Sequence, residues 1–422
     1  MPTRIVILGA GTGGTLTANR LRRACDDDVE IVVVDRDDRH VYQPGLLFVP
    51  FGLAESTELV RSRRAQLHDG IDFRIAEVEQ VDLPGNRVHL DDGSTVDYDV
   101  LVVASGAVLQ PEETEGLPGP GWGRNVFTFF EAESAQALHT ALQGFDRGRI
   151  VVNPIDMPIK CPVAPLEFCF LLDWYLHQRG VRDDVELTYV TCLDGAFTKP
   201  VASERLSSLL ADKGIEVVTE FATGEVDAEH GRLVSYDERE VPFDLLVTIP
   251  LHGGPSYVGR SPGLGDEFGF VPTDPRTLQA RAADNVFAIG DATNLPASKA
   301  GSVTHFEGDT VVANIQHFLA GEDLEATFDG HSNCFIETGF HKALLIDFNY
   351  DREPLPGRYP DAHVGPLPLL KESRMNHIAK LLFQWVYWHA LLPGHDIPGI
   401  SAQMQHAAKD PALTGADQGT PR

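Results

Sequence analysis

Basic residues are scarce in this sequence. Lys and Arg number 34 against 62 Asp and Glu, which gives a formal net charge of −28 at pH 7 over 422 residues. Contacts to a phosphate backbone need clustered cations, so this balance excludes a nucleic-acid-binding surface as the default. It also disfavours docking to anionic lipid by charge alone. We therefore expect no nucleic-acid partner.

Cysteines and long apolar runs are also few. Five cysteines in a chain of this length do not make the disulfide framework of a small secreted domain. No Cys-x-x-Cys pair occurs, so no zinc ribbon and no metal site are expected. No apolar run reaches the length of about 18 residues that a membrane span needs. Because the first predicted strand begins at the third residue, we expect no signal peptide and a cytoplasmic protein.

The first forty residues carry a phosphate-binding pattern. The apolar run Ile5–Leu8 predicts a strand buried on both faces, and the glycines that follow fit G-x-G-x-x-G ahead of helical spacing. A second buried strand ends at Asp35, whose carboxylate would accept from a ribose hydroxyl. Glycines here would permit a tight turn, close approach of a pyrophosphate and helix packing. The predicted dinucleotide-binding residues are Gly9, Ala10, Gly11, Gly14 and Asp35.

Two later segments resemble boxes found in flavoproteins with two dinucleotide-binding domains. Residues 285–292 predict a short buried strand stopped by Gly290 and Asp291, and the Asp of such a box accepts from the ribityl chain. Residues 98–106 predict another buried strand, where these enzymes normally end in Ala-Thr-Gly. This chain has Ala104, Ser105 and Gly106, which keeps the hydroxyl. Together the boxes predict FAD bound by pieces that are distant in sequence.

The middle of the chain lacks a second glycine motif, with which related flavoproteins bind nicotinamide. Residues 149–153 predict a strand, yet no glycine lies between Gly148 and Gly180. Three prolines between residues 154 and 162 remove amide donors that a pyrophosphate would need. Nicotinamide is therefore not the expected electron donor. Further strands predicted over 186–191 and 243–250 keep the Rossmann-like scaffold.

Cys161 stands where the phosphate loop would be, between Lys160 and Pro162. We predict a helix start at this point, and a helix N-terminus with an adjacent cation favours thiolate over thiol. A small buried core residue is the alternative.

At this point the chain resembles the sulfide:quinone oxidoreductase family over essentially residues 1–400. Besides the glycine boxes, the matching positions are 37–50, Cys161, Pro165, Glu167, 299–301 and 333–335. The resemblance implies that Cys161 and Cys334 lie on one face of the flavin. It implies that sulfide attacks a disulfide or trisulfide joining them, that electrons pass through FAD to a quinone, and that sulfur leaves as polysulfide or to an acceptor.

The same resemblance assigns supporting residues. Lys299 matches a position whose ammonium faces the pyrimidine end of the flavin, with a solvated surface lysine as the alternative. Glu167 would assist proton transfer near Cys161, or it is a structural remnant of the lost nucleotide motif. The remaining implied cofactor positions are Gln43, Pro44 and Val78. Many members carry a third cysteine in the segment that matches 118–130, and this chain has none there.

Residues 371–392 predict an amphipathic, aromatic-rich helix. Met375, Ile378, Leu382, Trp385 and Leu392 recur at three-and-four spacing, and Lys371, Arg374, His377 and Lys380 mark the other side. Too short and charged to span a bilayer, this helix fits a membrane interface, with Phe383, Trp385, Tyr387 and Trp388 at headgroup depth. A membrane-soluble quinone needs such a contact. An ordinary docking helix or a dimer contact is the alternative.

The predicted fold class is α/β, with two Rossmann-like three-layer domains and a C-terminal membrane-interface segment. A chain of 422 residues has room for two or three domains. We predict an FAD-binding domain in two parts, 1–112 and 268–330. Residues 113–267 form the second Rossmann-like domain, which carries Cys161, and 331–422 form the quinone and membrane segment with Cys334.

The favoured hypothesis is a flavoenzyme that oxidises sulfide, or a related small sulfur compound, and reduces a quinone. It would act as a peripheral protein on the cytoplasmic side of the cell membrane, with a homodimer left open. A type II NADH:quinone reductase is disfavoured by the missing glycine motif. Two further hypotheses are a flavin-binding electron-transfer subunit that docks a cytochrome and a redox sensor that uses Cys161 and Cys334.

Overall fold

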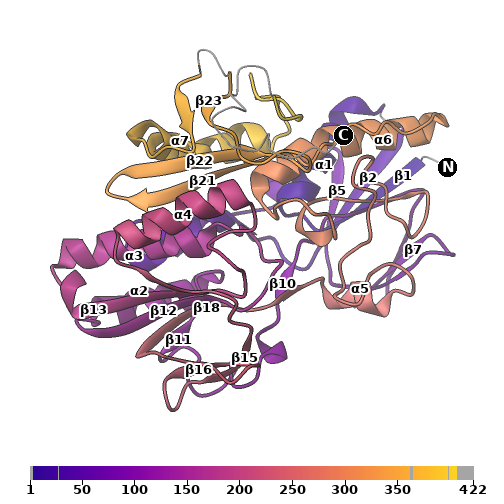
Figure 1. Cartoon of the computed structure of the whole chain (residues 1–422). Helices are drawn as coiled ribbons and strands as arrows, with labels where there is room; N and C mark the ends of the chain where they lie inside the picture. Colours follow the sequence, from indigo (N-terminus) through magenta and orange to yellow (C-terminus); the bar gives the residue numbers. More distant parts are fainter. Residues whose placement is uncertain (1–2, 27, 362–364, 398, 406–422) are drawn as a thin grey trace, which may run out of the picture.

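Two parallel five-stranded sheets form the frame of the computed structural model, which describes residues 3–26, 28–361, 365–397 and 399–405 (Figure 1). The first sheet, in spatial order, consists of β20 (Val286–Ala288), β9 (Val100–Val103), β1 (Thr3–Leu8), β2 (Val29–Asp35) and β5 (Ile71–Ile75). The second consists of β11 (Val126–Phe127), β18 (Leu245–Ile249), β12 (Gly148–Pro154), β13 (Val185–Val190) and β14 (Glu216–Val218).

The first sheet joins segments from both ends of the chain. β20 pairs with β9, with Val286 opposite Leu101, although almost two hundred residues separate them. Strands β1, β2 and β9 are buried on both faces over most of their length, as the strands of parallel sheets usually are. Ile5 and Ile7 belong to one core cluster and Val6 and Leu8 to another, on opposite faces. This sheet confirms the predicted α/β class with a discontinuous FAD-type domain, while the predicted domain boundaries stay a prediction.

Helices and small sheets cover the two large sheets. The helices are α1 (Thr12–Ala24), α2 (Ala132–Gln143), α3 (Ala164–Arg179), α4 (Pro200–Asp212), α5 (Ser256–Arg260), α6 (Gly301–Ala320) and α7 (Arg374–Val386). Two antiparallel three-stranded sheets are formed by β6 (Val78–Asp82), β7 (Arg87–Leu90) and β8 (Thr95–Asp97), and by β15 (Thr223–Asp227), β16 (Arg232–Ser235) and β17 (Glu240–Pro242). Two-stranded pairs are β3 (His40–Val41) with β4 (Val60–Arg61), and β23 (Gly357–Tyr359) with β24 (Leu367–Leu369).

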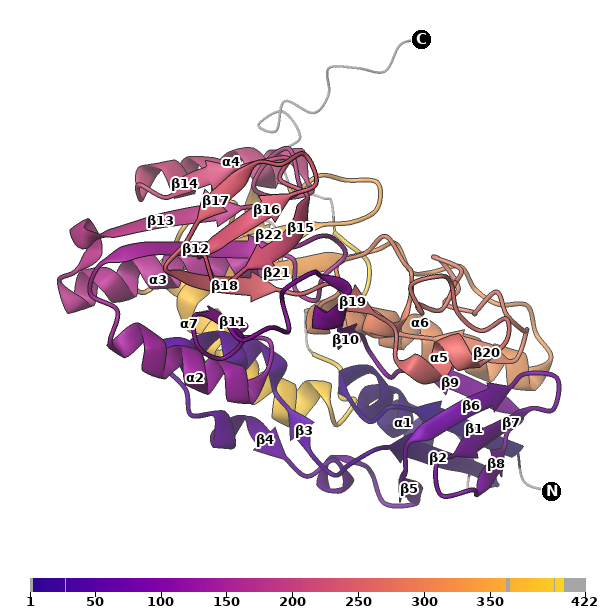
Figure 2. The same ribbon diagram turned by 90° about the horizontal axis from the view of Figure 1, so that it is seen from below.

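The two halves meet at short connecting strands. β10 (Val108–Leu109) pairs with β19 (His252–Gly253), and Figure 2 shows this pair between the two large sheets. Figure 2 also shows α7 running beneath the second sheet towards α1. The site described below therefore draws on segments from both halves.

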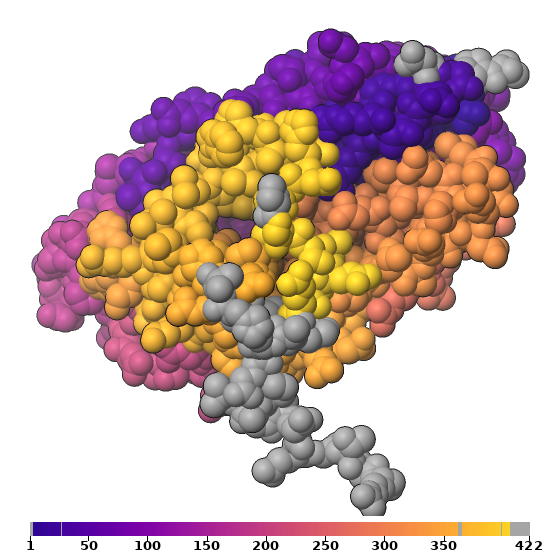
Figure 3. Space-filling view, turned by 90° about the horizontal axis from the view of Figure 1, so that it is seen from above, coloured from indigo at the N-terminus to yellow at the C-terminus, as the bar shows by residue number. Residues whose placement is uncertain are grey.

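The C-terminal segment joins the halves on the other side. The hairpin of β21 (Ser332–Gly339) and β22 (Lys342–Phe348) packs on α3, and α7 packs on β22. A single turn of π-helix, η7 (Tyr387–Leu391), continues α7. In Figure 3 these yellow residues lie between the indigo N-terminal part and the orange hairpin region. Among the described residues, no helix combines the length and the apolar character that crossing a membrane requires.

We expect Gly14→Ala to destabilise the protein by about 1–3 kcal/mol, as overpacking does elsewhere. A Cβ at Gly14 would lie 1.8 Å from the Gly9 carbonyl oxygen, so the backbone of α1 must shift away from β1. Thermal unfolding measures the effect. Gly259→Ala is the matched control, because a Cβ there meets nothing within 4 Å. Equal melting temperatures for the two variants would contradict this packing account.

Candidate active site

In the glycine loop after β1, Gly9 and Gly14 are packed tightly against neighbouring backbone, whereas Gly11 faces open space. Gly9 has a φ of +98°, and a Cβ there would lie 2.6 Å from the Ala104 carbonyl oxygen of the neighbouring strand end. A Cβ on Gly11, in contrast, would meet nothing within 4 Å. Gly11 directly precedes α1, so the open space lies at a helix N-terminus. The loop therefore fits a dinucleotide pyrophosphate.

The acidic groups of the predicted FAD site lie at the ends of their strands. Asp35 accepts a hydrogen bond from the Ala10 amide at 2.6 Å and forms an ion pair with Arg63. The Asp291 carboxylate has no hydrogen-bond partner among the described residues, and burial raises its pKa. A carboxylate in that state fits the predicted role of accepting from a ribityl hydroxyl. The Gly290 amide donates to Glu307 at 2.6 Å, a contact that sequence reasoning did not predict.

Other predicted cofactor positions lie in several settings. Ser105 shares a hydrogen bond of 2.8 Å with the Tyr257 hydroxyl, next to Gly106 with its φ of +71°. Val78 is half-buried at the first residue of β6. Gln43 and Pro44 are exposed at the start of η1 (Gln43–Phe51), a 3₁₀ helix. Their contacts with FAD stay predictions.

Cys161 lies in a strained loop that is bonded to the opposite half of the molecule. Its φ is +47°, a left-handed conformation that non-glycine residues seldom adopt and that recurs at functional sites. Its amide donates to the Lys299 carbonyl at 2.6 Å, and its own carbonyl accepts from Ala164 at 2.8 Å. The Cys161 loop is thereby connected to the segment that follows the Gly290–Asp291 turn.

Cys161 and Cys334 meet in one buried cluster although they are distant in sequence. Cys334 lies on β21 in the buried hydrophobic core, and the partly buried Cys161 packs against the same core; both thiols are free. Burial raises the pKa of Cys334, and the nearby Cys161 raises it further. The two sulfur-bearing residues implied by the resemblance are thus brought together.

The expected thiolate at Cys161 is wrong for this state of the protein. Helix α3 begins three residues later, at Ala164. Burial and the Glu167 carboxylate raise the pKa of Cys161 to about 12, and the opposing cation is Lys380 rather than the adjacent Lys160. Desolvation outweighs the local charges, because a buried thiolate loses its hydration.

Glu167 belongs to a buried polar network that reaches the C-terminal helix. Its carboxylate pairs with Lys380 and accepts from the Glu337 amide at 2.8 Å. The Glu337 carboxylate in turn lies 3.0 Å from His377 Nδ1. Burial raises the pKa of Glu167. Burial by itself lowers the pKa of Lys380, but the carboxylates of Glu167 and Glu337 raise it, and the net effect is a rise. Sequence reasoning missed Glu337 entirely.

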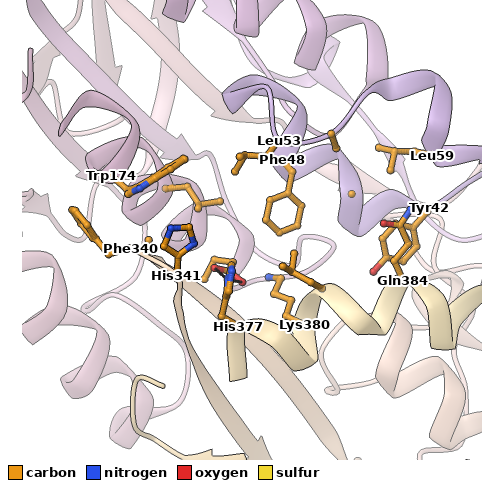
Figure 4. A pocket seen from close by; sticks show the side chains of 16 residues that line it. Tyr42, Phe48, Leu53, Leu59, Trp174, Phe340, His341, His377, Lys380 and Gln384 are labelled. Atoms are coloured by element: carbon orange, nitrogen blue, oxygen red, sulfur yellow. Dashed lines mark hydrogen bonds and ion pairs between the residues drawn. The ribbon is translucent and has the colours of Figure 1, made fainter. Parts of the chain in front are cut away.

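A cavity of about 300 Å³ lies beside this network (Figure 4). The figure shows Phe48 and Lys380 facing each other across its middle, with Trp174 and Phe340 at one end and Tyr42 and Gln384 at the other. Its lining is mostly apolar, and its polar groups come from Tyr42, Glu337, His341, His377, Lys380 and Gln384. An apolar cavity with a few convergent polar groups is the usual form of a small-molecule site.

Helix α7 turns two of its polar side chains inward, while Arg374 at its first residue is exposed. His377 and Lys380 point to the buried carboxylates, whereas five large apolar side chains are between 48% and 62% exposed: Met375, Ile378, Leu381, Leu382 and Trp385. A globular surface helix has the reverse orientation. The prediction that Tyr387, Trp388 and Leu392 share the exposed face is wrong, because all three are buried.

Tyr387 connects the C-terminal segment to the glycine loop. Its hydroxyl lies 2.8 Å from Thr12 Oγ1 and 2.7 Å from His40 Nε2, and His40 Nδ1 lies 3.1 Å from the Ala10 carbonyl. Burial lowers the pKa of His40 to about 4, so the ring is neutral and donates to that carbonyl. Tyr387 then donates to His40 and accepts from Thr12. The sequence could not predict that Tyr387 contacts Thr12 and His40, because an aromatic residue in a predicted helix carries no pattern that points to a distant partner.

Comparisons with known proteins agree with this geometry. The model of the pyridine nucleotide-disulphide oxidoreductase family matches residues 3–153. Mitochondrial sulfide:quinone oxidoreductases from Mus musculus and Dictyostelium discoideum are 25% and 27% identical, each over 93% of this chain and 86% of the relative. The structure of a sulfide:quinone oxidoreductase from Aquifex aeolicus has a TM-score of 0.79 and 20% identity, over 93% of this chain and 92% of that one. The last likeness concerns the fold.

We expect Tyr387→Phe to weaken FAD binding by up to about 30-fold, since it removes two hydrogen bonds of about 1 kcal/mol each that orient the loop. Titration of the apoprotein with FAD measures the change. Tyr236→Phe is the control, because Tyr236 is 79% exposed. Unchanged affinity in Tyr387→Phe would show that the C-terminal segment does not order the glycine loop.

Proposed function

This chain is an FAD-binding relative of the sulfide:quinone oxidoreductases, and on that premise we propose that it oxidises sulfide, or a related small sulfur compound, and reduces a quinone. The observation that carries the proposal is that Cys161 and Cys334 lie near each other, and that the Cys161 amide donates a hydrogen bond to the Lys299 carbonyl oxygen. A type II NADH:quinone reductase takes its electrons from a nicotinamide and does not need two converging thiols, and the cavity beside α7 favours a quinone over a docked cytochrome as the acceptor.

The cysteine chemistry begins from the oxidised pair. Hydrosulfide attacks the Cys161–Cys334 disulfide, so one sulfur–sulfur bond breaks and another forms, which gives a persulfide on one cysteine and a thiolate on the other. Lys380 lowers the pKa of Cys161 against the effect of burial, so its ammonium favours the leaving thiolate. FAD, when bound, supplies the acceptor for the two electrons and passes them to the quinone.

The cavity beside α7 is the proposed quinone site. Apolar walls from Phe48, Leu171 and Trp174 suit a quinone ring, and Lys380 and His377 offer hydrogen-bond donors to its carbonyl oxygens. Reduction of a quinone also consumes two protons. Glu337 bonded to His377, and Glu167 paired with Lys380, are the groups placed to hold a proton next to the cavity.

The exposed face of α7 is the proposed membrane contact. Leu381 belongs both to this face and to the cavity lining, and the exposed Leu53 and Phe340 also line the cavity. An apolar face that continues into an apolar cavity lets a lipid-soluble ligand enter without crossing water. The protein would bind the surface as a peripheral protein.

Anaerobic sulfide addition to the FAD-loaded protein tests the redox proposal. We expect rapid bleaching of the flavin band, which a soluble quinone analogue reverses. Cys161→Ser and Cys334→Ser should each slow bleaching by at least about 1,000-fold, as loss of other catalytic nucleophiles does. Cys25→Ser is the control, because Cys25 lies at the end of α1.

Each competing hypothesis has its own outcome in the same experiment. Bleaching that persists in both cysteine variants would overturn the thiol mechanism. Bleaching by NADH would favour the type II reductase, and haem that copurifies would favour the electron-transfer subunit. Reversible oxidation of the cysteines without consumption of sulfide would favour a sensor.

A vesicle experiment tests the membrane contact. We expect the protein to sediment with phosphatidylcholine vesicles, and the double variant Leu382→Ser, Trp385→Ser to bind at least about ten-fold more weakly, because two exposed apolar side chains are lost. Neither side chain lines the cavity, so turnover with a short-chain quinone should stay unchanged. Tyr236→Ser is the control. The membrane proposal would be contradicted if the parent protein failed to sediment with the vesicles. It would also be contradicted if the protein were a dimer that the double variant abolishes, because a second copy of the chain would then cover the exposed face of α7.

A further inference from the structure

Three polar side chains from distant segments gather beyond the Gly290–Asp291 turn. They are Lys160 before the strained cysteine, His252 on β19 and Lys299 ahead of α6. The backbones of Lys160 and Lys299 form a β-bridge. The Phe130 ring lies 6.0 Å from Lys160 Nζ and 5.6 Å, edge-on, from the His252 ring. Figure 2 shows β19, the strand of His252, between the two halves.

His252 has a buried acceptor with no partner. Its Nδ1 lies 2.9 Å from the Pro250 carbonyl oxygen, which can only accept, so Nδ1 carries the hydrogen. Burial and the Lys160 ammonium lower the pKa of His252 to about 3, so the ring is neutral and Nε2 is a bare acceptor. His252 is 5% exposed, and its Nε2 has no hydrogen-bond partner among the described residues. A buried acceptor without a partner is destabilising unless a ligand donates a hydrogen bond to it.

The two lysines have donors to spare. Lys299 Nζ donates to the carbonyl oxygens of Asp291 at 3.0 Å and Thr293 at 2.6 Å, which uses two of its three hydrogens. Lys160 Nζ has no hydrogen-bond partner within the part of the chain that the structure describes. Its charge acts on His252 and Asp291 rather than on Cys161, where the sequence had suggested a role. The cluster thus offers one acceptor and two donors.

We propose that Lys160, His252 and Lys299 together bind the pyrimidine edge of the flavin, with N3–H donating to His252 Nε2. That edge presents one donor, N3–H, between two acceptors, O2 and O4, so its pattern is the complement of the cluster. Asp291, the predicted ribityl partner, lies close enough to both lysines for their charges to lower its pKa against the effect of burial, so a ring attached to that ribityl chain would lie next to the cluster. The resemblance implies only Lys299, whereas Lys160 and His252 come from the structure.

This assignment has a consequence for the redox centre. Lys160 adjoins Cys161 in the chain, so a hydrogen bond from Lys160 to the ring would position the ring relative to the thiol. Two ammonium groups at this edge also stabilise the negative charge that the ring gains on reduction, because both are largely removed from water. The inference rests on FAD binding and not on the identity of the sulfur substrate.

Reconstitution of the apoprotein with FAD and with 3-methyl-FAD tests the hydrogen bond to His252. The methyl group replaces the N3 hydrogen, so we expect the parent protein to bind the analogue at least about ten-fold more weakly than FAD. His252→Leu removes the acceptor and should bind both cofactors with similar, weakened affinity. His252→Gln, which restores an acceptor oxygen, should regain part of the preference for FAD.

A second measurement reports on the lysine. Lys160→Met should lower the midpoint potential of the bound flavin, and Lys371→Met, at an exposed position outside the cluster, should not. The same discrimination against 3-methyl-FAD in His252→Leu and in the parent would overturn the role of His252. An unchanged potential in Lys160→Met would overturn the role of Lys160. If sulfide fails to bleach the flavin while these results hold, the proposed substrate falls and the edge assignment stands.

Discussion

A buried ion pair between Lys380 of α7 and Glu167 of α3 determines how the C-terminal segment lies on the rest of the molecule. The two side chains are 11% and 2% exposed, and Glu167 also accepts from the Glu337 amide of β21. Removing one partner of such a pair leaves an uncompensated buried charge, at a cost of about 3–5 kcal/mol. Because Lys380 must reach inward, the opposite side of α7 turns outward, and that side is apolar.

The same pair lies between two chemically different sites. On one side its charges act on Cys161 and Cys334, and on the other Lys380 lines the apolar cavity. Lys380 is therefore next to the thiols and is also part of the cavity lining. The strained conformation of Cys161 is held by a hydrogen bond to the Lys299 segment, so the thiol is fixed against the half of the molecule that binds FAD.

Local patterns predicted the parts of this fold that depend on neighbouring residues. The apolar runs before Gly9, Gly106 and Gly290 are strands, because a strand buried on both faces leaves a continuous apolar pattern. The meeting of Cys161 with Cys334 followed from resemblance, since no local pattern links remote residues. The state of the Cys161 thiol was predicted incorrectly, because desolvation depends on groups that only the fold assembles. Periodicity likewise showed that α7 has two faces but not which one meets the core.

The π-helical turn explains how one continuous segment can serve both surfaces. In a regular helix, the exposed Trp385 would be followed on the same face by residues three and four positions later. Tyr387, two positions after Trp385, lies on the opposite side of the helix, and the wider turn that begins there also brings Trp388 into the core beside His40, whereas His389 stays exposed and stacks on Trp385. The segment therefore presents apolar side chains outward over α7 and, one turn later, a hydroxyl to Thr12 at the glycine loop. The exposed apolar face and the hydroxyl that contacts the glycine loop therefore belong to one continuous segment, because successive turns of that segment point to opposite sides.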